Sequence, residues 1–220
     1  RVITYGLQGD WDWTAKNVGV TDGSYGTYDL YHEGGFIAHV RLGVPGAHNV
    51  SNSLAAAAAA TLCGASPAQI VEGLESFHGA GRRFEFLGTE AGVTIADDYA
   101  HHPTEISAAK GMGYQQVWAI FQPFTYSRTA RHLDGFVSSL SIADKVIVSD
   151  IMGSREENTY HVSSQQITDR IPGALYLPTF QEISDYVTAH ADEGDLVLTM
   201  GGGDVYKCAR MIAEQLKAKK

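Results

Sequence analysis

Short runs in which hydrophobic and polar residues alternate fill the first 44 residues of the chain. Turn-forming residues separate these runs at 22–26 and again at 32–35, where a hairpin tip is expected. The pattern predicts antiparallel β-structure for residues 1–44. The alanine-rich segment 51–63 that follows predicts a helix, because alanine has the highest helix propensity and the segment is too long for a single strand.

A second helix is marked by the residues at its start. Ser66 stands at the N-cap, Pro67 at the first helical position and Gln69 at the third, which is the arrangement of a capping box. Glycines at 79–81 are expected to end this part of the chain. The hydrophobic residues expected on one face of the helix are Ile70, Leu74 and Phe77.

From Phe84 onward the chain alternates between apolar strand segments and helix segments. Strands are expected at 92–97, 116–121, 144–149, 174–177 and 195–200, and helices at 103–113, 129–141, 163–170, 179–191 and 203–218. Because the strands are short and apolar, as parallel strands buried on both faces are, the pattern predicts a doubly wound α/β domain with a mostly parallel sheet. The change of pattern predicts two domains, residues 1–84 and residues 85–220.

The composition is that of a globular protein, with 44% hydrophobic and 19% charged residues in 220. Sixteen Lys and Arg against twenty-five Asp and Glu give a net charge of −9. This balance argues against a general role in binding nucleic acid or acidic membranes, but it leaves room for a local phosphate pocket. The most apolar run, 54–62, is about half the length of a membrane span.

The two cysteines, Cys63 and Cys208, lack the spacing of a metal or redox site. We therefore expect reduced structural thiols in a cytoplasmic protein. The chain opens on Arg1 with a strand-like segment and without the pattern of a signal peptide, as a segment of a longer protein would.

Chemistry is expected in the loops after the strands, because ligands of a doubly wound sheet meet the carboxyl ends of its strands. Residues 97–105 gather two aspartates, a tyrosine and two histidines, which could bind a divalent cation; alternatively, one aspartate caps a turn and the others are solvated. In the loop 121–129, Arg128 either holds a carboxylate or phosphate or is an ordinary surface arginine. The glycines of 200–204 either pack closely or cradle a phosphate.

Two further pairs of residues are candidates for binding. His48 and Asn52 are four residues apart, so they share a helix face and could offer a donor and an acceptor to a planar ring. Arg82 and Arg83 stand at the expected domain junction, where they could hold an anion or lie in a solvated linker.

Taken together, four motifs resemble those of the Mur ligases of peptidoglycan synthesis. They are Gly-x-His-Asn-x-x-Asn from residue 46, Gly-Arg-Arg-Phe-Glu from 81, Asp-Asp-Tyr-Ala-His-His-Pro-Thr-Glu from 97, and Phe-Gln-Pro with Tyr-Ser-Arg-Thr within 121–129. The family has a UDP-binding domain, a central P-loop ATPase domain and a C-terminal Rossmann-like domain. This chain resembles the end of the second domain and all of the third, and its sequence lacks the Gly-Lys-Ser/Thr of a P-loop.

The resemblance implies an ATP-dependent amide-bond ligase of cell-wall synthesis. In such an enzyme ATP converts a substrate carboxylate into an acyl phosphate, which an amine then attacks. The resemblance is greatest to members that join L-alanine to UDP-N-acetylmuramate. It implies ATP and Mg²⁺ as cofactors, with Mg²⁺ bound mostly by the missing N-terminal part, and it implies that the isolated chain is inactive.

The resemblance also assigns residues to the nucleotide. His48 and Asn52 would contact the adenine and Asp98 the ribose. Arg83 would contact the ATP phosphates and act as a catalytic residue. No residue of this chain is assigned as a metal ligand.

On the substrate side, the resemblance places Tyr99, His101 and Arg128 beside the muramoyl group or the acyl phosphate, with His101 a second catalytic residue. Many similar members carry a histidine where this chain has Phe124. Because a phenyl ring cannot donate a hydrogen bond to a carboxylate or phosphate, Arg128 is expected to be the better anchor for an anion.

Two alternatives stay open at this point. A ligase that recycles murein peptides shares the Asp-Asp-x-Ala-His-His-Pro loop but resembles Glu-Pro-Arg-Ser-Asn-Thr in the second loop, and residues 121–129 favour the alanine-adding enzyme. A non-catalytic α/β module that binds a nucleotide or a sugar would explain the absence of the P-loop without any missing domain.

Overall fold

The structure is a computed structural model that describes residues 2–21, 25–99 and 103–219. The chain divides into two compact units, Arg1–Gly79 and Ala80–Lys220, called unit 1 and unit 2 below. No helix in the described ranges is long and apolar enough to cross a membrane.

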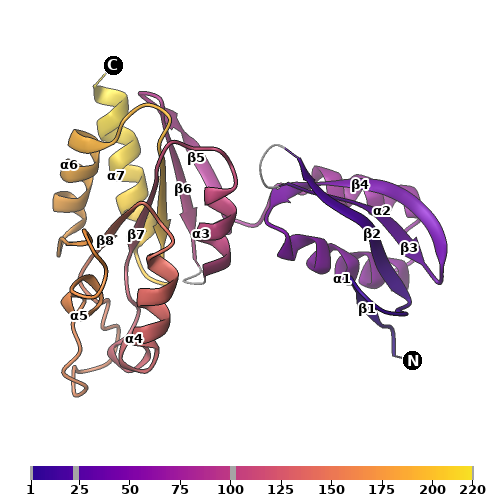
Figure 1. The fold of residues 1–220 in the computed structure, drawn as a ribbon, viewed down its shortest axis with the longest axis horizontal. Helices are drawn as coiled ribbons and strands as arrows, with labels where there is room; N and C mark the ends of the chain where they lie inside the picture. Colours follow the sequence, from indigo (N-terminus) through magenta and orange to yellow (C-terminus); the bar gives the residue numbers. More distant parts are fainter. Residues whose placement is uncertain (1, 22–24, 100–102, 220) are drawn as a thin grey trace. The chain divides into compact units, whose positions relative to one another are not determined.

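Unit 1 is a four-stranded sheet with two helices (Figure 1). Its strands, in order across the sheet, are β1 (Tyr5–Gly6), β2 (Trp13–Thr21), β3 (Tyr25–His32) and β4 (Gly35–Pro45). The pairs β2–β3 and β3–β4 are antiparallel, as predicted, whereas the short β1 runs parallel to β2. Hydrophobic residues of α1 (His48–Leu62) and α2 (Pro67–Ser76) share one core with the sheet.

Local sequence signals decide several features of unit 1. The hairpin tip predicted at 32–35 is confirmed, with Glu33 and Gly34 both at positive φ, as a tight two-residue turn requires. The capping box of α2 is also confirmed, since the Ser66 hydroxyl accepts the N–H of Gln69. Ile70, Leu74 and Phe77 line one groove, as expected of residues on one side of the segment, but α2 ends at Ser76, so Phe77 lies in extended chain after the helix and is 53% exposed.

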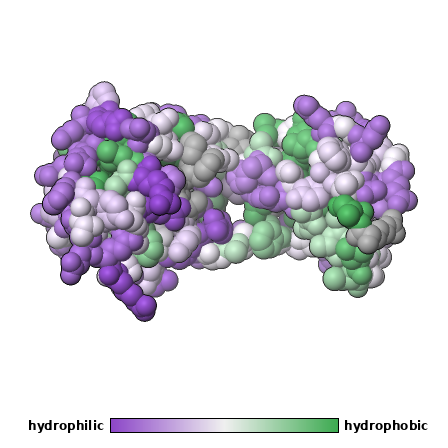
Figure 2. Space-filling model, turned by 90° about the horizontal axis from the view of Figure 1, so that it is seen from below, coloured by the Kyte–Doolittle hydropathy of each residue, from purple (hydrophilic) through white to green (hydrophobic). Residues whose placement is uncertain are grey.

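An apolar surface remains on unit 1. A groove of about 320 Å³ runs between α1 and α2, lined mostly by alanines of α1 and by Ile70, Leu74 and Phe77 of the second helix and its end. Leu62, at the end of α1, is also exposed. Figure 2 shows hydrophobic residues gathered on the visible face of this unit.

Unit 2 is a doubly wound, three-layer α/β domain, as predicted (Figure 1). Its six strands, in order across the sheet, are β5 (Glu85–Glu90), β6 (Val93–Asp98), β10 (Leu196–Met200), β7 (Val117–Phe121), β8 (Lys145–Val148) and β9 (Leu175–Tyr176). All neighbours are parallel except β5, which pairs antiparallel with β6.

Two hydrophobic clusters hold the layers of unit 2 together. Residues of α3 (Pro103–Lys110), α4 (Tyr126–Leu140) and α5 (Gln165–Thr168) pack on one face of the sheet. Residues of α6 (Phe180–His190) and α7 (Val205–Ala218) pack on the other. The sheet is therefore covered on both faces, which explains why its central strands are mostly apolar, with buried polar residues only near the carboxyl ends of β6 and β10.

The edge strand β5 was not predicted from the sequence. Its residues are half-buried at most, so they carry no run of apolar residues like the central strands, and a shift in register at Gly88 interrupts the pairing with β6. The other strands and helices of unit 2 lie within a few residues of the predicted segments, although α5 is only four residues long.

Strand order brings three of the loops to one place. β10 lies between β6 and β7, and Met200 pairs with Asp98 on one side and with Phe121 on the other. All three strands end at the same level and run in the same direction. The loops singled out from the sequence therefore leave neighbouring strands at one edge of the sheet.

The two cysteines provide a chemical test of this fold. Cys208 is fully buried on α7, and burial raises the pKa of its thiol to about 12, whereas Cys63 is exposed. Because the thiolate is the reactive form, we expect a disulfide reagent to modify one thiol per native chain quickly and the second only after denaturation. Cys63→Ser should abolish the fast reaction, and rapid modification of that variant would contradict the packing of α7.

Candidate functional site

The candidate site of unit 2 is built where β6, β10 and β7 end. Backbone hydrogen bonds continue beyond the strands, because the Gly201 N–H donates to the Asp98 carbonyl (3.1 Å) and the Gln122 N–H donates to the Met200 carbonyl (3.0 Å). The first residues of the loops after β10 and β7 are thus held by the sheet itself, whereas the Tyr99 N–H, at the start of the loop after β6, donates to the Arg82 carbonyl. Side chains that follow them start from fixed positions.

Asp97 forms the central ionic contact of this edge. Its carboxylate is 1% exposed; Oδ2 accepts the Arg82 Nε–H at 2.9 Å and Oδ1 accepts the Thr199 hydroxyl at 2.6 Å. The same guanidinium donates to the Gly201 carbonyl at 3.0 Å. Burying a carboxylate lowers the stability of the fold unless the charge is paired and hydrogen-bonded. Arg82 supplies the opposite charge that stabilises the buried Asp97.

Asp98 holds a turn rather than facing solvent. It is 2% exposed, and its Oδ2 accepts the backbone N–H of Phe84 at 2.7 Å. One aspartate therefore caps a turn, as one alternative proposed, but Asp97 is buried instead of solvated. Within residues 2–21, 25–99 and 103–219, no three His, Cys, Asp or Glu side chains gather as a metal site would require. His101, predicted as catalytic, lies outside the described residues.

The turn held by Asp98 carries Arg83. Arg82 and Phe84, on either side of it, both have positive φ, which costs a non-glycine residue about 1–2 kcal/mol. Hydrogen bonds offset this cost, since the Arg82 N–H donates to Glu85 Oε2 at 2.6 Å and the Arg82 carbonyl accepts the Tyr99 N–H at 2.8 Å. Arg83 is exposed, and its guanidinium carbon lies 5.9 Å from the centre of the Tyr99 ring.

The glycine turn after β10 packs closely. Gly201 has a φ of +142°, and a Cβ there would lie 2.5 Å from the Gln122 carbonyl oxygen. A Cβ at Gly203 would collide with Gln122 Oε1, which accepts the Asp204 N–H at 2.8 Å. These contacts favour the close-packing interpretation over a phosphate cradle. The Asp204 carboxylate is paired with Lys207 at 2.8 Å.

The second loop is tied to the loop after β8. Thr125 is the N-cap of α4, and the next turn places Arg128 on the surface. The Ser127 N–H and hydroxyl donate to Glu156 at 2.8 and 2.5 Å, and these hydrogen bonds lower the pKa of the Glu156 carboxyl. Sequence reasoning missed Glu156, because nothing in its local sequence indicates a partner so far away. Phe124 forms a parallel bridge with Met152 of the same neighbouring loop.

In unit 1, α1 begins at His48, so His48 and Asn52 do share a helix face. Both are exposed, and the Asn52 amide donates to Asn49 Oδ1 at 2.9 Å. Gly46 has a φ of +98°, and a Cβ there would lie 2.6 Å from the His48 ring. The remaining described candidates, Arg83, Asp98, Tyr99 and Arg128, belong to unit 2.

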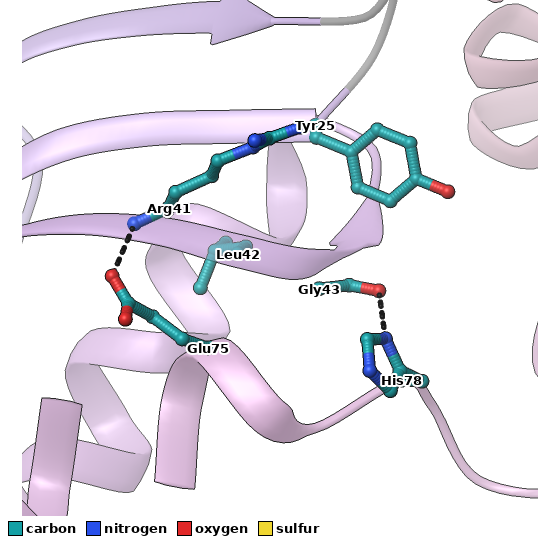
Figure 3. A pocket seen from close by; sticks show the side chains of 6 residues that line it. All are labelled: Tyr25, Arg41, Leu42, Gly43, Glu75 and His78. Atoms are coloured by element: carbon teal, nitrogen blue, oxygen red, sulfur yellow. Dashed lines mark hydrogen bonds between the residues drawn. The ribbon is translucent and has the colours of Figure 1, made fainter. Parts of the chain in front are cut away.

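Unit 1 also contains a cavity that the sequence did not indicate. It measures about 530 Å³ and is lined by Tyr25, Arg41, Leu42, Gly43, Glu75 and His78 (Figure 3). Two hydrogen bonds join its lining residues across β4 and the end of α2, from the Arg41 N–H to Glu75 Oε1 (3.2 Å) and between His78 Nδ1 and the Gly43 carbonyl (3.3 Å). None of the candidate residues lines this cavity.

Comparison with known proteins agrees with the motifs. The family model described as "Mur ligase, glutamate ligase domain" matches residues 82–203. The UDP-N-acetylmuramate–L-alanine ligase of Caldanaerobacter subterraneus subsp. tengcongensis is 40% identical over 99% of this chain and 49% of its own length. The ligase of the same name from Agathobacter rectalis is 43% identical over 93% of this chain and 46% of its own length. The chain spans about half the length of these relatives.

Solved structures of two such ligases have a fold similar to that of this chain. The UDP-N-acetylmuramate-alanine ligase of Thermotoga maritima has a TM-score of 0.81 at 25% identity and covers 99% of this chain, which in turn covers 48% of that one. A murein peptide ligase from Psychrobacter arcticus has a TM-score of 0.63 at 27% identity, over 94% of this chain and 44% of its own.

The buried ion pair predicts a large effect of a small substitution. Asp97→Asn removes the charge that neutralises Arg82, and we expect it to lower the free energy of unfolding by about 2–3 kcal/mol. Asp134→Asn is the matched control, because Asp134 pairs with Arg170 at 2.8 Å while its side chain is 89% exposed, and we expect a change within about 0.5 kcal/mol. Urea unfolding followed by circular dichroism measures both. Equal effects of the two substitutions would contradict the role of Asp97.

Proposed function

Because the chain belongs to the Mur ligase family, we propose that it is the C-terminal part of an ATP-dependent ligase that joins L-alanine to UDP-N-acetylmuramate. In this proposal residues 1–84 are the end of a central ATPase domain and residues 85–220 are the C-terminal domain. Support comes from relatives of that name at 40% and 43% identity, of which the chain spans about half. The exposed apolar groove between α1 and α2 is consistent with further protein packed against unit 1.

The observation that carries the proposal is that Arg83 is exposed in a turn that the buried Asp98 carboxylate fixes through its hydrogen bond with the Phe84 N–H. A guanidinium in a fixed position can stabilise the negative charge that develops on the transferred phosphoryl oxygens, because it need not move during the reaction. We propose that Arg83 contacts the phosphates of ATP and that Asp98 contacts the ribose while its Oδ2 keeps Phe84 in place. His48 and Asn52, on one exposed face of α1, are proposed to contact the adenine.

The proposed reaction has two steps. A carboxylate oxygen of UDP-N-acetylmuramate attacks the γ-phosphorus of ATP, which gives an acyl phosphate and ADP. The amine of L-alanine then attacks the acyl carbon, a C–N bond forms, the C–O bond to phosphate breaks, and the amine loses a proton. We propose that Tyr99, His101 and Arg128 contact the acyl-phosphate side, with His101 a catalytic residue.

Mg²⁺ and the phosphate chain are proposed to bind mostly to a part of the ligase outside this chain. The 220 residues contain no P-loop motif. The two aspartates at the end of β6 already accept hydrogen bonds from Arg82, Thr199 and Phe84, so they are poorly suited to serve as a cation's ligands. When bound, the metal would screen charge on the transferred phosphoryl group.

Phosphate release by the full-length ligase tests the proposed function. With ATP, Mg²⁺ and UDP-N-acetylmuramate present, we expect release that depends on L-alanine. A murein tripeptide in place of L-alanine should give little release. Preference for the peptide would replace the proposal by the recycling ligase, and no release with either acceptor would favour a non-catalytic module.

The isolated chain is expected to be inactive in the same assay. Transfer needs the phosphates, Mg²⁺ and the acceptor carboxylate to be positioned together, and displacement by about 1 Å already costs on the order of 10²-fold. Turnover by the chain alone at about 1–10³ per second, the usual range of enzymes, would show that the ATP site had been assigned to the wrong part of the protein.

Arg83→Ala in the full-length ligase tests the phosphate contact. We expect kcat/KM for ATP to fall by about 10²-fold, as for the loss of a single positioned donor, with little change in unfolding free energy because Arg83 is exposed. Lys217→Ala, at an exposed cation in the last turn of α7, is the control and should leave kcat/KM unchanged. Equal kinetics of the two variants would remove Arg83 from the site.

A further inference from the structure

Five side chains at the edge of unit 2 alternate between guanidinium groups and phenol rings. The Arg82 guanidinium carbon lies 5.2 Å from the centre of the Tyr99 ring and 4.7 Å from the centre of the Tyr206 ring. The guanidinium carbon of Arg83 lies 5.9 Å from the centre of the Tyr99 ring, and that of Arg210 lies 5.4 Å from the centre of the Tyr206 ring. Lys207 Nζ also lies 5.8 Å from the centre of the Tyr206 ring, and among these four cations Arg82 is the one that contacts both rings.

Arg82 is fixed on its remaining sides as well. Its Nε–H donates to Asp97 and its terminal nitrogen to the Gly201 carbonyl, so one guanidinium joins the ends of β6 and β10. The charge is neutralised by Asp97, and the Arg82 side chain is 26% exposed. A guanidinium engaged in this way is poorly placed to bind a substrate anion, and its contacts suit a role in holding other groups.

Tyr99 depends on Arg82 through two contacts. Its backbone N–H donates to the Arg82 carbonyl, and its ring, which is about half exposed, lies beside the Arg82 guanidinium. Tyr206, from the first turn of α7, lies against the same guanidinium from another element. At a partly exposed site, a guanidinium–ring contact favours the position in which the two groups touch over displaced positions by about 2- to 30-fold.

We propose that Tyr206 and Arg82 are positioning residues for Tyr99. Tyr206 restricts the position of the Arg82 guanidinium, and Arg82 in turn restricts the ring and the backbone of Tyr99. A residue of α7 thereby orients Tyr99, which lies in the loop after β6. This inference rests on the proposed function for the role of Tyr99 at the muramoyl group. The contacts that carry it lie wholly within unit 2.

The test compares two substitutions at Tyr206. Tyr206→Phe keeps the ring and its contact with Arg82, whereas Tyr206→Leu keeps an apolar side chain of moderate size without a ring. In the full-length ligase we expect Tyr206→Leu to raise KM for UDP-N-acetylmuramate about 3- to 30-fold with kcat within twofold, because uniform binding is lost. Tyr206→Phe should match the wild type. If Tyr206→Leu instead lowered kcat and left KM unchanged, the substitution would only have reduced the fraction of folded enzyme. That result would overturn the proposal.

A second measurement uses the 220-residue chain and needs no activity. Hydrogen exchange of the Tyr99 amide, which donates to the Arg82 carbonyl, should become about 2- to 30-fold faster in Tyr206→Leu and stay unchanged in Tyr206→Phe. Equal exchange in the two variants would overturn the positioning role. If the wild-type ligase shows no activity with L-alanine, the proposed function fails, and the exchange result alone then decides whether Tyr206 positions Tyr99.

Discussion

The ion pair between Arg82 and the buried carboxylate of Asp97 is the interaction on which the candidate site depends. Asp97 is the residue before the end of β6, and its charge is tolerable there only because Arg82 and Thr199 donate to it. Through Arg82 the pair reaches Gly201, at the start of the turn after β10. The turn that precedes β5 and two strand ends are thereby joined by a single guanidinium.

Strand order makes this junction possible. Because β10, the last strand in sequence, is inserted between β6 and β7, residues far apart in the chain become neighbours at the carboxyl edge of the sheet. Gly201 and Gly203 allow the turn after β10 to approach Gln122 of the adjacent loop. The backbone strain at Arg82 and Phe84 is concentrated in the same place, beside the residue proposed to meet the phosphates.

Much of the fold follows from local sequence, and the contacts within the site do not. The alternation after Phe84 predicted the mostly parallel sheet, and the capping pattern at Ser66 predicted the start of α2. The loops that carry Arg83, Asp98, Tyr99 and Arg128 were also identified. The edge strand β5, the partners of Arg82 and the link from Glu156 to Ser127 were missed, because each depends on pairing between distant segments that leaves no local periodicity.

A double-mutant cycle between Arg82→Met and Asp97→Asn, read as unfolding free energy of the chain, tests whether these two residues act as one unit. If Arg82 is held by Asp97 as described, the two substitutions are not additive, and we predict a coupling energy of about 1–3 kcal/mol. The double variant should then be little less stable than the worse of the two single variants. Additive effects, with a coupling below about 0.3 kcal/mol, would contradict the account of this junction.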